Sequence, residues 1–155
     1  MPAKTINPVQ KIVGTLLYYS IVVDPTILAA LGSNSAQQAK GTEQTYADTL
    51  LLLNYEATHP NATIWYTASD MVLHIHSNTS YLSETRARSR TGGHYFLGDI
   101  HPNMSKPPIT CPRLNGPIHS ISCIMSNVMG AAADAEIGAT YINGQEDIPI
   151  RTLLL

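Results

Sequence analysis

Two histidines and an asparagine occupy every second position of one short segment. His74, His76 and Asn78 alternate with apolar or small residues, so a β-strand would present all three on one face. Imidazoles two residues apart on a strand can both reach one metal ion. No third ligand follows at a suitable spacing, so we interpret the pair as solvent-facing or hydrogen-bonded rather than as a metal site.

Two carboxylates and three arginines offer further chemistry. Asp134 and Glu136 stand two residues apart, which on a helix separates them by about 200° and prevents them from sharing one ion. One would point into a site and the other into water. Arg86, Arg88 and Arg90 alternate with small residues, and on an extended segment they would project to one side. Such a row suits phosphate oxygens, and a solvated loop is the alternative interpretation.

The composition excludes several classes of protein. Only 13% of the 155 residues are charged and the formal net charge is −2, which argues against nucleic-acid binding by bulk charge. A hydrophobic content of 44% is sufficient for a core. Cys111 and Cys123 are the only cysteines, too few for a disulfide framework. Glycosylation sequons begin at Asn61, Asn78 and Asn103, as chance produces in a chain rich in Asn, Ser and Thr.

The elements that must position these residues change type along the chain. Helical spacing and capping signals predict helices over residues 8–19, 25–32 and 42–59. Alternation predicts strands over residues 62–67, 71–76, 94–97 and 117–124, with turns at 69–70 and 91–93, a proline-rich loop over 99–116 and a final helix over 131–145. We therefore expect a helical lead-in, residues 1–60, and an α+β (α/β) unit, residues 61–155.

The two ends of the chain lead to further expectations. Residues 12–31 are nearly uncharged, but Asp24 and Pro25 interrupt them, which favours two buried helices over a membrane span. The N-terminus has no basic region leading into a cleavable apolar stretch. We expect an intracellular protein, cytoplasmic or nuclear, without a membrane anchor. The uncapped Leu153, Leu154 and Leu155 indicate a truncated end.

Six segments form a pattern when they are taken in chain order: residues 13–18 with 23–25, 51–55, 76–81, 89–98, 117–120 and 132–137. Together they resemble the reverse transcriptase tail and ribonuclease H segment of copia-like retrotransposon polyproteins. The resemblance runs from about Pro8 to about Ile142. It implies a partial ribonuclease H-like mixed sheet with a packed helix.

Ribonuclease H enzymes cleave RNA in RNA–DNA hybrids with two Mg²⁺ ions held by clustered carboxylates, whose charge offsets the repulsion between the ions. The resemblance places the first aspartate of the family at Asn78 and the glutamate at Glu136. An amide supplies no charge, so Glu136 is left as a weak metal ligand. The later aspartates of the family would lie beyond Leu155. We therefore expect no cofactor, and Mg²⁺ only if nuclease activity remains.

Three functions compete at this point. The first is a non-catalytic ribonuclease H-like protein, serving as a binding or structural module. The second is an RNA–DNA hybrid endonuclease in which a partner chain supplies further carboxylates. The third is a self-associating structural protein, joined through an incomplete sheet edge and Leu153–Leu155.

Overall fold

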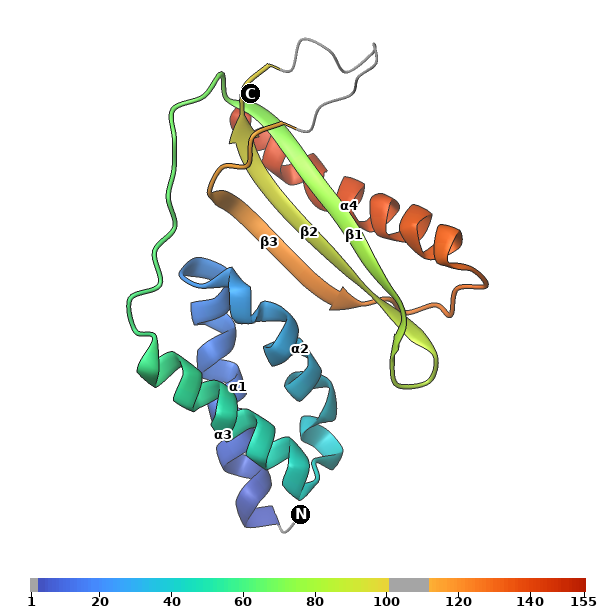
Figure 1. Cartoon of the computed structure of the whole chain (residues 1–155). Helices are drawn as coiled ribbons and strands as arrows, with labels where there is room; N and C mark the ends of the chain where they lie inside the picture. The colour runs from blue at the N-terminus through green and yellow to red at the C-terminus, as the bar shows by residue number, and fades with distance from the viewer. Residues whose placement is uncertain (1–2, 101–111) are drawn as a thin grey trace. The chain divides into compact units, whose positions relative to one another are not determined.

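The computed structural model describes residues 3–100 and 112–155 (Figure 1). The chain forms two compact units, Met1–Ile64 and Trp65–Leu155. The boundary predicted from the sequence, between residues 60 and 61, lies slightly earlier. Cys111 and the sequon at Asn103 lie outside the described residues.

The first unit is helical, as predicted. Its elements are α1 Ala3–Val22, the short 3-10 helix η1 Pro25–Ile27, α2 Leu28–Gln37, a second 3-10 helix η2 Gln38–Lys40, and α3 Glu43–Thr58. The core is formed by apolar side chains of η1 and all three α-helices: Val9, Val13, Leu16, Ile27, Leu31 and Leu52. Burial of this cluster holds the three α-helices together.

Local capping determines where two of these elements begin. The Asp24 carboxylate accepts a hydrogen bond from the Thr26 backbone N–H at 3.0 Å, and Pro25 opens η1. Thr42 caps α3, in a reciprocal pair of side-chain and backbone bonds with Thr45. Such caps satisfy N–H groups that have no partner within the helix.

Three predicted helix limits are wrong. The final helix, predicted over residues 131–145, continues to Leu154. The first helix begins before Pro8, at Ala3, and contains Pro8 as its sixth residue. The second continues past Gly32 to Gln37. Glycine lowers helix stability without ending a helix whose next turn is buried, here through Asn34.

The second unit is a three-stranded sheet with one helix. Its elements are β1 Val72–Glu84, β2 Arg88–Gly98, β3 Pro117–Ile124 and α4 Ala132–Leu154. The strand order is β1-β2-β3 and both pairings are antiparallel, so the fold class is α+β. The predicted mixed sheet is not present in the described residues, where all three strands pair in antiparallel fashion.

The segment 62–67 was predicted as a strand, but the structure has none there. Its polar groups instead bond to Asn115 and to Pro117, the first residue of β3. The Tyr66 hydroxyl donates to the Pro117 carbonyl at 2.9 Å, and the Thr67 N–H donates to Asn115 Oδ1 at 2.8 Å. β-Branched and aromatic composition therefore misled the prediction where no strand was available to pair.

The predicted turn at residues 91–93 lies inside β2. The chain reverses earlier, at residues 85–87, where Arg86 and Ala87 have φ of 63° and 53°. Gly93 serves a different purpose, because a Cβ atom there would overlap Asn143 Oδ1 and lie 2.9 Å from the Tyr95 ring. The glycine lets α4 approach the sheet closely.

α4 packs its small side chains against the sheet. Ala135 and Ala139 are fully buried, and Asn143 is 2% exposed. These positions recur every four residues, so they form one face of the helix. Tyr95 and Phe96 are both fully buried, and as neighbours on β2 they point to opposite faces of the sheet.

Candidate functional site

Asn78 and Glu136, the two residues that the resemblance singles out, lie on different sides of the sheet. Ser77 points toward α4, because its Oγ accepts a hydrogen bond of 2.7 Å from Asn143 Nδ2. Asn78 is the next residue on β1 and therefore points away from α4. Glu136 is exposed on α4 itself. The structure thus places the sheet between the Asn78 amide and the helix that carries Glu136.

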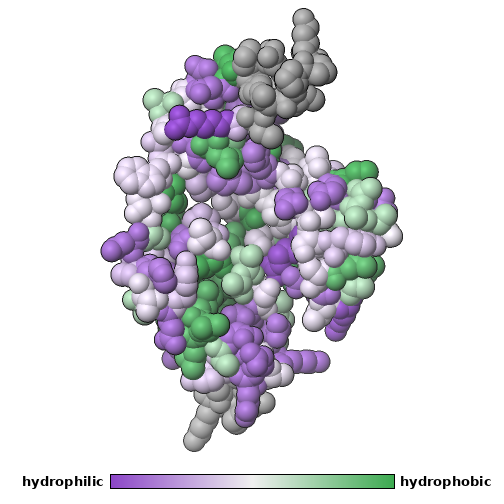
Figure 2. All heavy atoms as spheres, in the orientation of Figure 1, coloured by the Kyte–Doolittle hydropathy of each residue, from purple (hydrophilic) through white to green (hydrophobic). Residues whose placement is uncertain are grey.

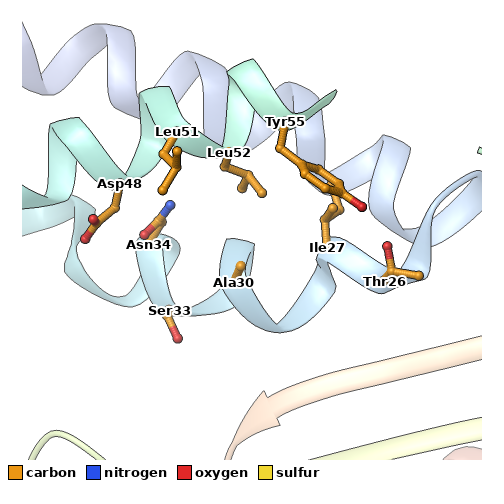
Figure 3. Close-up of a pocket in the computed structure, with 9 residues that line it drawn as sticks. All are labelled: Thr26, Ile27, Ala30, Ser33, Asn34, Asp48, Leu51, Leu52 and Tyr55. Carbon is orange, nitrogen blue, oxygen red and sulfur yellow. The ribbon is translucent and has the colours of Figure 1, made fainter. Parts of the chain in front are cut away.

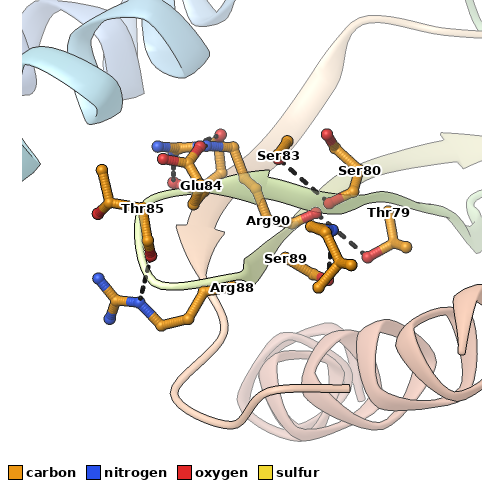
Figure 4. A network of polar contacts seen from close by, with 10 residues as sticks. Thr79, Ser80, Ser83, Glu84, Thr85, Arg88, Ser89 and Arg90 are labelled. Atoms are coloured by element: carbon orange, nitrogen blue, oxygen red, sulfur yellow. Dashed lines mark hydrogen bonds and ion pairs between the residues drawn. The ribbon is translucent and has the colours of Figure 1, made fainter. Parts of the chain in front are cut away.

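The three arginines do not form the predicted row (Figure 4). Arg86 lies in the turn, with a φ of 63°. Arg88 Nε donates to the Thr85 carbonyl at 3.4 Å. Arg90 Nε contacts Glu84 Oε1 at 2.7 Å, and the two side chains are only 10% and 14% exposed. The turn between β1 and β2 breaks the alternation, and the ion pair occupies Arg90.

His74 and His76 share one face of β1, as the alternation predicted. Phe96 lies opposite His74 in the register, and His94 lies opposite His76. Each of the three imidazole centroids is 5.3 Å from the Phe96 ring centroid. A Cβ atom at Gly98 would lie 2.7 Å from the His74 ring. The histidines therefore pack around a buried aromatic ring on the face opposite α4.

Two of these imidazoles are already engaged through Nε2. His74 Nε2 lies 3.0 Å from the Asp99 carbonyl oxygen, and His94 Nε2 lies 3.2 Å from that of Asn115. A carbonyl only accepts, so each Nε2 carries a proton and donates it. Within residues 3–100 and 112–155, no group of three His, Cys, Asp or Glu could hold a metal ion. The contacts favour the hydrogen-bonded interpretation of His74 over metal binding.

The sequence did not single out the polar centre of this unit. The Tyr95 hydroxyl lies 2.8 Å from Asn143 Oδ1 and 2.9 Å from the Asn143 carbonyl. Asn143 Nδ2 lies within hydrogen-bond distance of Ser77 Oγ and of the Gly92 and Ala139 carbonyls. The available signal was the spacing of Asn143 from Ala135 and Ala139, which places an amide on the buried face of α4.

Burial of this centre changes the acidity of its phenol. Burial raises the pKa of Tyr95 to about 12, with smaller contributions from Glu146, Asp147 and Cys123. A buried phenolate lacks the hydration that stabilises its charge in water. Tyr95 is therefore a permanent hydrogen-bond donor near neutral pH and serves packing rather than proton transfer.

No protein-family model, curated protein or solved structure matches the chain. In the described part of the chain, no helix has both the length and the apolar character needed to cross a membrane.

Proposed function

We propose that the unit Trp65–Leu155 is a ribonuclease H-like module, derived from a copia-like retrotransposon polyprotein, that does not cleave RNA–DNA hybrids as this chain. The observation that carries the proposal is the placement of Asn78 and Glu136 with the sheet between them. A catalytic role for this pair requires both side chains to reach one site.

The order of the elements supports the assignment to this family. The resembling segments 76–81, 89–98 and 117–120 fall on β1, β2 and β3, and 132–137 falls on the start of α4. The resemblance implies strands for the first of these segments and a helix for the last. The agreement is between the order of the segments and the order of the strands and helix, and it does not extend to catalytic residues.

The chemistry of the donor set does not fit two Mg²⁺ ions. Magnesium prefers oxygen ligands, and two neighbouring divalent ions require concentrated negative charge. Asn78 supplies a neutral amide, and Glu136 supplies one exposed carboxylate on the other side of the sheet. Arg86 and Arg88 remain as candidate contacts to a hybrid, whereas Arg90 is paired with Glu84. We therefore derive no hydrolytic step for this module.

A cleavage assay tests the proposal. The full chain, the Glu136→Gln variant and the Asn78→Asp variant are incubated with a labelled RNA–DNA hybrid in Mg²⁺ or Mn²⁺. We expect no cleavage by any of them, because even an aspartate at position 78 would face away from α4. Metal-dependent cleavage by the unmodified chain that disappears in Glu136→Gln would overturn the proposal. Circular dichroism verifies that each variant is folded.

We infer a second candidate function, self-association, from the exposed edge of β1. Among the described residues, β1 pairs only with β2, and it has no charged residue before Glu84 at its end. Unpaired strand edges without charges readily pair with another chain. Leu153, Leu154 and Leu155 are also exposed, and Figure 2 shows hydrophobic residues among hydrophilic ones on the face in view.

Light scattering after size-exclusion chromatography tests self-association. We expect oligomers of the full chain at tens of micromolar, and fewer of them in the Ser80→Lys variant, because a lysine on an edge strand opposes pairing. The Gln145→Lys variant adds the same charge on an exposed position of α4 and serves as the control. A clean monomer of the unmodified chain would remove this candidate.

A further inference from the structure

An open groove of about 540 Å³ runs between α2 and α3 in the helical unit (Figure 3). The residues that matter to its chemistry are Ile27, Ala30, Asn34, Asp48, Leu52 and Tyr55. They recur at intervals of three or four residues on each side, so two helical faces line the groove. Its volume lies in the range of small-molecule sites.

Side-chain size explains why the groove is open. The side chains on the α2 side leave space, because the one at its middle is the small Ala30. The Ser33 hydroxyl points away from α3 (Figure 3). Ile27 and Leu52 are 3% and 8% exposed and provide an apolar floor. The middle of the groove therefore suits an aliphatic body and offers it no hydrogen-bond partner.

Asn34 is the unusual residue of the groove. It is 7% exposed, and its carboxamide has no hydrogen bond with any described residue. Its amide atoms are not fully enclosed, and Figure 3 shows the side chain directed into the space between α2 and α3. A ligand in the groove can therefore bond to these amide atoms in place of water. A ligand with a polar head would satisfy the amide.

Asp48 gives the same end of the groove a negative charge. Figure 3 shows Asp48 and Asn34 together at one end, with Tyr55 and Thr26 at the other. Asp48 Oδ1 accepts a hydrogen bond of 2.7 Å from Gln44 Nε2, and no ion pair to Asp48 forms among the described residues. A cationic head would complement this carboxylate and donate to Asn34 Oδ1.

We propose that this groove binds a small aliphatic amine. Its ammonium group lies between Asp48 and Asn34, and its chain lies on Ile27, Ala30 and Leu52 toward Tyr55. The seven steps from Asp48 to Tyr55 span about 10 Å along α3. An extended chain zigzags and advances only about 1.25 Å for each bond of ~1.5 Å, so a chain of about eight bonds matches that length. This site lies wholly in the helical unit and is independent of the ribonuclease H-like proposal.

Titration of the isotope-labelled full chain with n-octylamine, followed by amide NMR shifts, tests the proposal. We expect saturable shifts confined to η1, α2 and α3, binding of n-octanol that is weaker, and binding of octanoate at least tenfold weaker than that of the amine. The carboxylate of octanoate would be repelled by Asp48, so the affinity for octanoate reports on the charge of the site. Octanol has no charge, so its affinity reports on the apolar floor.

Matched variants locate the site. Asp48→Asn should weaken amine binding about tenfold, whereas Glu43→Gln, which removes an exposed carboxylate at the start of the same helix, should leave it unchanged. Ala30→Leu should abolish binding of both the amine and the alcohol by filling the groove. Equal affinity for octanoate and octylamine, shifts outside η1, α2 and α3, or undiminished binding in folded Ala30→Leu would each overturn the proposal.

Discussion

The hydroxyl of Tyr95 lies 2.8 Å from the carboxamide oxygen of Asn143 and joins β2 to α4 at the centre of the second unit. Both residues are almost fully buried, at 0% and 2% exposed. A hydrogen bond in such a place rigidifies the packing, and the loss of one partner leaves the other unsatisfied. We therefore regard this pair as the main polar determinant of how α4 sits on the sheet.

Removal of the Tyr95 hydroxyl should destabilise the second unit. The Tyr95→Phe variant leaves Asn143 Oδ1 without its donor, and we expect a loss of about 1–2 kcal/mol in the free energy of unfolding. Urea unfolding followed by circular dichroism measures it. Tyr141→Phe removes the same group from a tyrosine that is 68% exposed and should change little. Equal effects of the two substitutions would contradict the account.

A methyl group at Gly93 should be costly, and one at Gly92 should be tolerated. At Gly93 the added carbon would overlap the Asn143 carboxamide, whereas at Gly92 its nearest neighbour would be the Ile121 carbonyl at 3.9 Å. We expect Gly93→Ala to lose about 1–3 kcal/mol through overpacking. The loss should shrink in an Asn143→Ala background, as a double-mutant cycle can measure. If Gly93→Ala lost the same stability in the Asn143→Ala background, the clash would be with a group other than Asn143.

Glu56 should make the stability of the helical unit depend on acidic pH. Burial, together with nearby Asp24, raises the pKa of Glu56 above its ordinary 4.5, and His59 opposes this. The folded state then binds the proton more tightly than the unfolded state. The stabilisation is therefore fully present below the ordinary pKa of 4.5. It is lost as the pH rises through the higher pKa of the folded state.

Urea midpoints of the helical unit between about pH 4 and about pH 7 measure this dependence. Glu56→Gln should flatten the profile and raise stability at neutral pH, because Glu56 Oε1 is buried without a partner in the described residues. Glu43→Gln, at an exposed position on the same helix, is the control. A profile in Glu56→Gln as steep as that of the unmodified chain would be the contrary result.

Replacement of the unpartnered amide in the groove should stabilise the protein. Asn34→Leu has similar size and removes a polar group that lacks a hydrogen bond, so we expect a gain of about 1 kcal/mol in unfolding free energy. Asn54→Leu, at an exposed position on α3, should be near neutral. Thermal unfolding of both variants decides the point. A loss of stability in Asn34→Leu would indicate that the amide has a partner.

Local patterns in the sequence were sufficient for some elements and misleading for others. The strand over residues 117–124 was predicted with the limits observed, because alternation and a starting proline coincide there. Alternation also placed His74 and His76 on one face. The prediction that the three arginines project to one side was wrong, because the turn lies at residues 85–87. The strand register that places this turn is not specified by the local sequence.

The contacts that position the candidate site depend on long-range packing. Tyr95 and Asn143 are 48 residues apart in the chain. Gly93 has the composition of a turn in the sequence, whereas its role in the structure is to leave space for α4. The sequence identified Asn78 and Glu136 as the residues to compare. Asn78 and Glu136 do not meet, because the pairing of β1 and the packing of α4 place them on opposite sides of the sheet.

Mn²⁺ affinity, measured by isothermal titration calorimetry, tests the central claim most directly. The proteins compared are the Asn78→Asp variant and the Asn78→Asp/Glu136→Gln double variant. Because the sheet separates position 78 from Glu136, we predict that the two proteins bind Mn²⁺ equally weakly. Tight binding by Asn78→Asp that is lost in the double variant would show that the two side chains form one metal site and would contradict the account.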